Sequence, residues 1–169
     1  MKIAIVGYSG SGKSTLARTL GERMCLPVLH LDQVQFLPGW QTRDKAEQQR
    51  LVTEFLDGHE SWIVDGNYAS LSWERRMAEA DRIVVLLFGR IACLRRVVRR
   101  RLAYRGRTRP DVTQGCPEKL DGEFLQWVLR DGRSERARSR YLGLRAQYPD
   151  KTAVLRTQRA LDDYLRKLR

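Results

Sequence analysis

The stretch Gly-Tyr-Ser-Gly-Ser-Gly-Lys-Ser-Thr at residues 7–15 decides the fold that we expect for this chain. It follows the apolar run from Ile3 to Val6 and precedes a stretch with helical spacing, from Leu16 to Met24. Glycines at these offsets let the backbone curl so that successive N–H groups face inward, and the helix directs its positive end at the same place. The sequence therefore predicts a strand, a phosphate-binding loop and a helix in direct succession.

The side chains of this loop suit a nucleoside triphosphate with its metal ion. Lys13 adds a point charge for the β- and γ-phosphates, and Ser14 can offer its hydroxyl to Mg²⁺. A glycine-rich surface turn before a helix is the alternative, but it does not explain why loop, lysine and helix end converge. ATP and Mg²⁺ are the expected cofactors, and the expected nucleotide-binding residues are Gly7, Ser9, Gly10, Ser11, Gly12, Lys13, Ser14 and Thr15.

The length and composition indicate one domain over residues 1–169. A chain of 169 residues with 42% hydrophobic residues can bury one core and is too short for two ordinary domains. The 3 cysteines are widely spaced, without a C-x-x-C pair, which suits a reducing compartment. The longest apolar stretch, Ile83 to Phe88, is far shorter than a bilayer requires. We therefore expect a cytoplasmic protein without a membrane partner.

The net charge of +12 is concentrated in the middle of the chain. Residues 89–145 hold 16 Lys and Arg against 6 Asp and Glu, whereas residues 1–88 hold 10 against 11. Such a basic block suits a nucleic-acid surface, a set of arginines that converge on a transferred phosphate, or the solvated faces of arginine-rich helices. The sequence leaves these three interpretations open.

Apolar periodicity predicts strands that alternate with helices. We expect strands at residues 2–6, 27–31, 61–65, 82–88 and 152–156. We expect helices at residues 13–24, 43–57, 72–80, 91–104, 120–130 and 134–147, and one that closes the chain from about residue 161. Residues 105–119 hold two glycines and two prolines without periodicity, which predicts a loop or lid. The alternation indicates a parallel sheet with right-handed crossovers and a ligand at the carboxyl ends of the strands.

Two aspartates are expected at that edge of the sheet. Asp65 ends a predicted strand, where it can hold Mg²⁺ through water, so Ser14 and Asp65 are the candidate metal ligands. Asp32 ends the second predicted strand, where it could accept a proton from an attacking hydroxyl. The alternatives are a strand-ending turn for Asp65 and a helix cap for Asp32.

Arginines are expected to face the same edge. Arg96 and Arg100 lie four residues apart on a predicted helix, so both project from one of its faces. The predicted lid holds three more, any of which could reach the transferred phosphate on closure: Arg105, Arg107 and Arg109. The candidate catalytic residues are Lys13, Asp32, Arg96 and Arg100.

Three further side chains are candidates for contact with a second substrate. Trp40 lies in a Pro-Gly-Trp turn and could stack on a substrate ring. Asn67 and Tyr68 follow the Asp65-Gly66 pair and could supply polar contacts to the acceptor.

Together these residues resemble the adenylate-kinase-like group of P-loop kinases and, within it, the small bacterial DNA topology modulation proteins. The likeness covers nearly the whole chain. Its most specific parts are the loop at residues 7–15, His30-Leu31-Asp32 with Pro38-Gly39-Trp40, and the stretch from Trp62 to Tyr68. The helix with Arg96 and Arg100 and the Arg-Thr-Arg-Pro loop at residues 107–110 match as well.

The resemblance implies a three-layer α/β sandwich of the P-loop NTPase type, with a five-stranded parallel sheet. It also implies an acceptor-binding lobe at about residues 33–60 and a short lid at about residues 105–119. The implied activity is an ATP- and Mg²⁺-dependent transfer of the γ-phosphoryl group to a small molecule. The family name implies instead an effect on DNA supercoiling, so a nucleotide-regulated protein that binds nucleic acid through residues 89–145 is the rival hypothesis.

The chain departs from one kinase pattern beside Asp65. Nucleoside monophosphate kinases usually follow their Asp-Gly pair with Phe-Pro-Arg, whereas this chain has Asn67-Tyr68-Ala69. The arginine that would hold an acceptor phosphate is therefore missing at this place. A nucleoside or another hydroxyl-bearing small molecule competes with a monophosphate as the acceptor.

Overall fold

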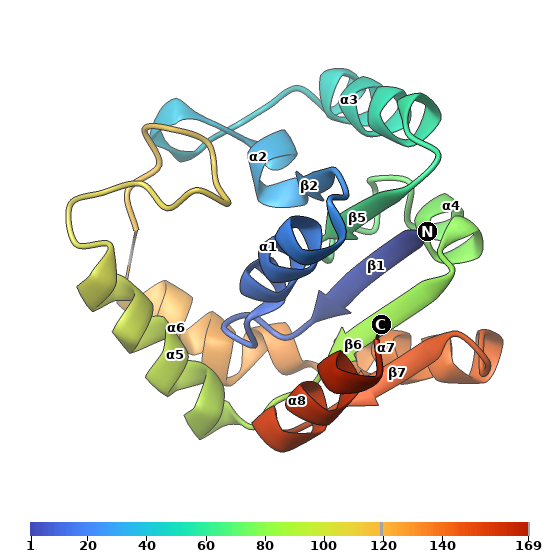
Figure 1. Cartoon of the computed structure of the whole chain (residues 1–169). Helices are drawn as coiled ribbons and strands as arrows, with labels where there is room; N and C mark the ends of the chain where they lie inside the picture. Colours follow the sequence, from blue (N-terminus) through green and yellow to red (C-terminus); the bar gives the residue numbers. More distant parts are fainter. Residues whose placement is uncertain (119, 169) are drawn as a thin grey trace.

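In the computed structural model, a five-stranded parallel sheet runs through the centre of the chain (Figure 1). The structure describes residues 1–118 and 120–168. The strands of the sheet lie in the order β2-β5-β1-β6-β7, and all adjacent pairs are parallel. Their bounds are Lys2–Gly7 for β1, Val28–His30 for β2, Trp62–Asp65 for β5, Arg82–Leu86 for β6 and Thr152–Leu155 for β7. The predicted α/β class with five parallel strands is confirmed.

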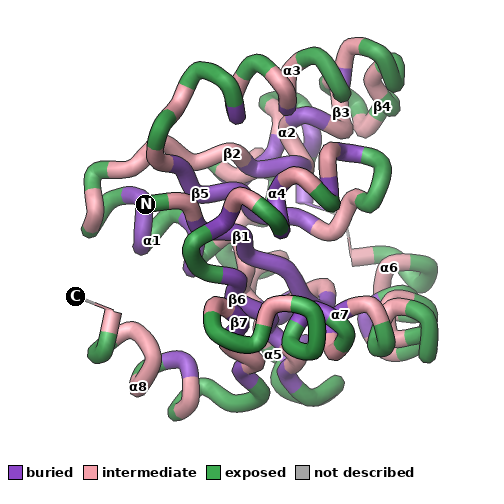
Figure 2. The backbone as a smooth tube through the Cα atoms, turned by 90° about the vertical axis from the view of Figure 1, so that its right-hand side faces the viewer, coloured by how far each residue is buried: buried purple, intermediate pink, exposed green. Residues whose placement is uncertain are grey.

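Helices on both faces of the sheet complete three layers. Helices α1 (Lys13–Met24) and α8 (Gln158–Lys167) lie on one face, and α4 (Trp73–Glu79) and α7 (Glu135–Gln147) lie on the other (Figure 1, Figure 2). The middle strand β1 is buried between these layers. Its residues Ile3, Ala4, Ile5 and Val6 have no exposed surface. Burial on both faces explains the unbroken apolar runs of these strands.

The remaining elements surround the carboxyl ends of the strands or extend from the sheet. Their bounds are α2 (Leu31–Gln35), β3 (Phe36–Leu37), β4 (Gln41–Thr42), α3 (Lys45–Gly58), α5 (Arg90–Ala103) and α6 (Gly122–Leu129). Short 3₁₀ turns lie at Pro38–Trp40 and Asp131–Arg133. Among the residues that the structure describes, no helix is both long enough and apolar enough to cross a bilayer.

The second strand is shorter than predicted, and this moves Asp32 into a helix. Residues 27–31 were expected to form the strand, but β2 ends at His30, and Leu31 and Asp32 form the first turn of α2. Leu31 is fully buried and packs closely against Gly66, where an added Cβ would lie 2.7 Å from the Cβ of Leu31. The chain turns at this point because Leu31 fills the core beneath the end of β5.

Helix α6 begins two residues later than predicted. Its first helical residue is Gly122, because the side chain of Asp121 caps the helix by accepting a hydrogen bond of 2.8 Å from the Phe124 N–H. Leu120 therefore lies outside the helix. The last residue of the predicted lid, Lys119, lies outside the described residues.

Residues 105–118, the described part of the predicted lid, pack against the β3–β4 hairpin. The Gly39 N–H donates to the Gly115 carbonyl at 2.9 Å, and Trp40 Nε1 donates to the Pro117 carbonyl at 3.0 Å. Thr113 Oγ1 donates to the Phe36 carbonyl at 2.6 Å. Figure 1 shows this loop beside α2, far along the chain from it. The contact joins α5 to the hairpin across the carboxyl ends of the strands.

Candidate active site

A cavity of about 1430 Å³ opens at the carboxyl ends of the strands. The phosphate-binding loop forms its floor, and α2 with the β3–β4 hairpin forms one wall. Helix α5 with residues 105–118 forms a second wall, and α6 with the start of α7 forms a third. Of the site residues predicted from the sequence, all line this cavity except Gly7, Arg105 and Arg107.

The phosphate-binding loop begins at a position that only glycine can occupy. Gly7 has a φ of +138°, and an added Cβ would lie 2.2 Å from the Leu86 carbonyl oxygen. The amide of Asn67 holds this residue from both sides, because Asn67 Oδ1 accepts from the Gly7 N–H at 3.0 Å and Asn67 Nδ2 donates to the Gly7 carbonyl at 2.7 Å. Asn67 was expected to contact the acceptor, but the structure uses its amide to anchor the loop.

Replacing Asn67 by alanine is expected to lower the free energy of unfolding by about 1–3 kcal/mol, because two backbone groups of Gly7 lose their partner. MgATP affinity should fall as well, since the loop loses its anchor. Urea unfolding and calorimetric MgATP titration measure the two effects. The matched control is Gln49→Ala, which removes an exposed amide that donates to Ser72 Oγ at 2.8 Å. Equal losses in the two variants would contradict the anchoring role.

Lys13 and the start of α1 present positive charge to the cavity. Lys13 Nζ donates to the Tyr8 carbonyl at 3.2 Å. Burial lowers the pKa of Lys13, and the charges of Asp65 and Asp32 oppose that shift. The N-cap residue of α1 is Gly12, which has no side chain to cap the helix, and the first turn holds no acidic residue. The first N–H groups of α1 thus remain available to an anion, so this floor fits a triphosphate.

Asp65 is buried with one oxygen satisfied and the other without a partner. Its Oδ1 lies 3.1 Å from His30 Nδ1, whereas no described residue forms a hydrogen bond with Oδ2. Burial lowers the pKa of His30, but the hydrogen bond and charge of Asp65 outweigh burial, so the net pKa is raised. An unpartnered buried carboxylate oxygen above the phosphate-binding loop fits a cation that arrives with a ligand.

No group of three His, Cys, Asp or Glu side chains that could hold a metal ion by itself occurs among residues 1–118 and 120–168. Ser14 and Asp65 supply two oxygen atoms at the cavity. A Mg²⁺ ion held there would take its other ligands from phosphate oxygens and water, which is how Mg²⁺ accompanies nucleotides. The donor set therefore fits a Mg²⁺–nucleotide complex.

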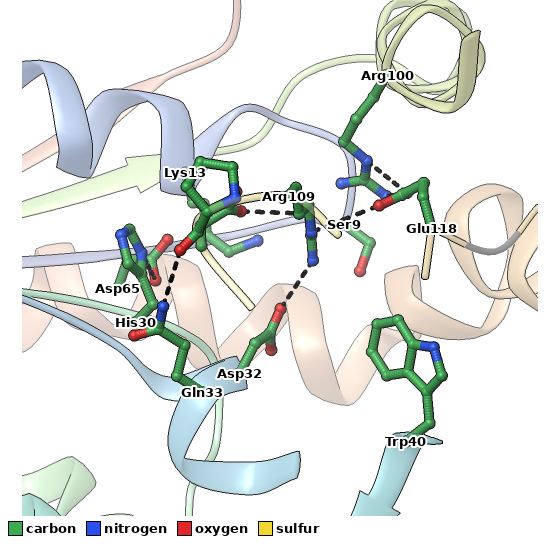
Figure 3. Close-up of polar contacts among 12 residues, drawn as sticks. Ser9, Lys13, His30, Asp32, Gln33, Trp40, Asp65, Arg100, Arg109 and Glu118 are labelled. Carbon is green, nitrogen blue, oxygen red and sulfur yellow. Dashed lines mark hydrogen bonds and ion pairs between the residues drawn. The ribbon is translucent and has the colours of Figure 1, made fainter. Parts of the chain in front are cut away.

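Asp32 belongs to a chain of charged contacts that spans the cavity, which we call the acid–arginine network (Figure 3). Its Oδ1 accepts from the Tyr68 hydroxyl at 2.7 Å, and its Oδ2 lies 3.2 Å from Arg109 Nη2. Arg109 also lies 3.3 Å from Asp111 and 3.5 Å from Glu118, which pairs in turn with Arg100 at 2.5 Å. The members of the network are Asp32, Arg100, Arg109, Asp111 and Glu118.

The structure separates the three arginines of the predicted lid. Arg109 is 8% exposed and lines the cavity, whereas Arg105 and Arg107 are exposed at the surface. The guanidinium of Arg109 contacts carboxylates and not the phosphate-binding loop. In this structure Arg109 links residues 105–118 to α2 through its ion pair with Asp32.

Arg96 and Arg100 both turn inward from α5, but they contact different parts of the cavity. Arg96 Nη1 donates to the Ser11 carbonyl at 3.3 Å, and Nη2 donates to Gln158 Oε1 at 2.6 Å. The guanidinium lies 4.1 Å from the ring centre of Phe88. Arg96 therefore braces the phosphate-binding loop, whereas Arg100 reaches Glu118.

Three further residues, from α6 and α7, line the cavity although they were not predicted as site residues from the sequence. Arg136 and Arg140 lie on α7 with the same four-residue spacing as Arg96 and Arg100, which was the signal available to find them. Trp127 of α6 is 50% exposed, and its Nε1 donates to Ser9 Oγ in the phosphate-binding loop at 3.0 Å.

The chain resembles solved structures, but it has no match among family models or curated proteins. Shikimate kinase from Acinetobacter baumannii, solved in complex with shikimate, matches with a TM-score of 0.59 and 18% identity, over 99% of this chain and 90% of that one. The chain has the fold of the P-loop kinases.

Two other solved structures agree over nearly the full length. An uncharacterized protein from Eubacterium ventriosum has a TM-score of 0.54 and 16% identity, over 99% of this chain and 98% of that one. Shikimate kinase from Bacteroides thetaiotaomicron has a TM-score of 0.50 and 16% identity, over 99% of this chain and 95% of that one. At such identities the likeness shows the P-loop kinase fold. The resemblance to the DNA topology modulation proteins stays a prediction.

Proposed function

We propose that this chain is an ATP- and Mg²⁺-dependent phosphotransferase that moves the γ-phosphoryl group to a hydroxyl of a small molecule. One observation carries the proposal. The phosphate-binding loop with Lys13, the unpartnered buried oxygen of Asp65 and the carboxylate of Asp32 line a single cavity. The P-loop kinase fold supports the same reaction class.

The donor side neutralises charge. The N–H groups of the loop and the start of α1 would hold the phosphates of ATP, and Lys13 would stabilise charge on the transferred group. Ser14 and Asp65 would hold Mg²⁺, which when bound draws charge from the phosphate oxygens. Arg96 would keep the loop in shape through the Ser11 carbonyl. Arg136 and Arg140 would approach the phosphates from α7.

The acceptor side would position the nucleophile and take its proton. The hydroxyl of the acceptor would donate to Asp32, and its oxygen would bond to the γ-phosphorus as the bond to the bridging oxygen of ADP breaks. The proton would pass to Asp32. Arg109 and Tyr68 each contact one oxygen of Asp32, and the remaining lone pairs of the carboxylate would accept the hydroxyl of the acceptor. Residues 105–118 would exclude water from this step.

An acceptor screen tests the proposal. With ATP, Mg²⁺ and a panel of nucleosides, nucleotides and sugars, one class should raise ADP formation about 100-fold or more above the rate without acceptor. Chelation of Mg²⁺ should abolish that gain. A coupled assay of ADP release measures the rates. Rates that are indifferent to every acceptor in the panel would count against a phosphotransferase.

Nucleic-acid binding is the second candidate, and the basic composition of residues 89–145 is the observation that favours it. Within this segment Arg96, Arg99, Arg100 and Arg109 line the cavity, whereas Arg95 is exposed on α5 and is not part of the lining. Affinity for duplex DNA that persists at about 0.15 M salt, with a salt dependence that reports several phosphate contacts, would support this candidate. Loss of affinity at that salt would count against it.

A further inference from the structure

We propose that the acceptor is an uncharged ring compound with several hydroxyl or amino groups, as in a nucleoside or a sugar, and that phosphate esters are rejected. This inference rests on the proposed phosphotransferase function and names the substrate class for the same cavity. It follows from the charge, the burial and the hydrogen-bonding capacity of one side of the cavity. This side consists of α2 with the β3–β4 hairpin and of α5 with residues 105–118, and we treat it as one wall.

The acid–arginine network itself carries an excess of negative charge. Three carboxylates, from Asp32, Asp111 and Glu118, face two guanidinium groups, from Arg100 and Arg109. Arg109 lies within 3.5 Å of all three carboxylates, and Arg100 lies 2.5 Å from Glu118. Both cations of the network, Arg100 and Arg109, already have acidic partners.

Burial makes these arginines costly to redirect. The side chain of Arg109 is 9% exposed and that of Glu118 is 3% exposed. If Arg109 turned toward an acceptor phosphate, Glu118 would keep a single cation and Asp111 would lose its own. Breaking a buried ion pair leaves an uncompensated charge, which costs more than the pair contributes when intact. The wall therefore disfavours a second anion beside the carboxylates.

The same carboxylates favour a ligand that is rich in donors. Ionised carboxylates only accept hydrogen bonds, so their free lone pairs call for O–H or N–H groups. The side chain of Asp32 is 36% exposed, which gives a ligand access to its oxygens. Hydroxyls of a sugar ring, or hydroxyls and an exocyclic amine of a nucleoside, supply such donors without adding negative charge.

Aromatic side chains complete this wall. The rings of Phe36 and Trp40 meet edge to face, with their centres 5.2 Å apart, and both line the cavity. The hydrogen bond from Trp40 Nε1 to the Pro117 carbonyl holds the indole in place. Figure 3 shows the indole on the side of the cluster where Asp32 and Glu118 lie. A fixed aromatic surface beside acceptor oxygens suits the flat face of a base or a sugar.

Positive charge is gathered instead around the phosphate-binding loop. Helix α7 packs against the loop, with the ring centres of Tyr8 and Tyr141 5.8 Å apart, and it carries Arg136 and Arg140 into the cavity. Lys13 lies on the floor of the cavity. The cavity thus has a cationic side for the triphosphate and an acidic, aromatic side for the acceptor.

Paired acceptors test the inference in the intact chain with saturating MgATP. We expect kcat/KM to be at least about 100-fold higher for uncharged acceptors than for their phosphate esters. The pairs are nucleosides against their 5′-monophosphates and sugars against sugar phosphates, so the two arms also distinguish a nucleoside from a sugar. Preference for a phosphate ester would overturn the inference and leave the phosphotransferase function standing. Transfer to no member of either pair would overturn the function itself.

A charge variant separates this explanation from simple exclusion by size. Asp111→Asn removes one negative charge, and it should lower the discrimination against the phosphate ester about tenfold. Glu118→Gln should act in the same direction, with circular dichroism to confirm that it folds. Glu54→Gln, on the exposed face of α3, is the control and should leave the ratio unchanged. A ratio that stays at the wild-type value in both network variants would overturn the electrostatic explanation.

Discussion

Replacing Lys13 by alanine should lower the rate of phosphoryl transfer about 10²–10³-fold, the loss typical when one preorganised charge is removed from a developing anion. Lys13 lies on the floor of the cavity, with the charges of Asp65 and Asp32 near it. Burial desolvates the ammonium group before ATP binds, and this desolvation lowers the pKa of Lys13. A desolvated charge exerts a stronger field on the phosphates. Within the loop at residues 7–15, no other side chain carries a charge.

The fold should survive the change. The side chain makes one hydrogen bond, to the Tyr8 carbonyl, so the free energy of unfolding should change by less than about 1 kcal/mol. Steady-state rates with the best acceptor and urea unfolding separate the two effects. Lys45→Ala, at the exposed start of α3, is the matched control and should retain full activity. A Lys13→Ala variant with more than about a tenth of the wild-type rate would refute the assignment.

The phosphate-binding loop and the sheet could be predicted from the sequence because their signals are local. Glycines at fixed offsets define the loop, and short apolar runs define strands that are covered on both faces. The position of Asp65 follows from the same logic, since a residue that ends a parallel strand lies at the edge where ligands bind. These features need no knowledge of which distant segments meet.

The proposed acceptor side could not be predicted in the same way because it is built from distant segments. Asp32 meets Arg109 across 77 positions, and the aperiodic stretch that carries Arg109 and Glu118 gives no signal of burial. The amide of Asn67 turns to Gly7, 60 positions away, although its place beside Asp65 suggested a substrate contact. Periodicity reports which face of one element is buried, and it cannot report which polar groups of two elements become partners.

The largest loss of stability is expected when Arg76 of α4 is replaced, a residue whose burial was not predicted from the sequence. Arg76 has no exposed surface, and its guanidinium donates to the carbonyls of Leu71 at 2.7 Å, Tyr68 at 2.8 Å and Gly66 at 3.3 Å. Burial lowers the pKa of Arg76 to about 10, against the opposing charge of Asp65. The arginine thus holds the turn between β5 and α4, which places Asn67 and Tyr68.

Arg76→Met keeps the apolar stem and removes the guanidinium, so three backbone acceptors lose their donor in the core. The free energy of unfolding should fall by about 3–5 kcal/mol, as a lower urea midpoint with an unchanged slope. The adjacent Arg75 is the matched control, because it is partly exposed and pairs with Glu79 and Asp57. Arg75→Met should cost at most about 1 kcal/mol, since exposed ion pairs contribute little. Equal midpoints for the two variants would show that the buried guanidinium does not hold this turn, and the position of Asn67 against Gly7 would then need another cause.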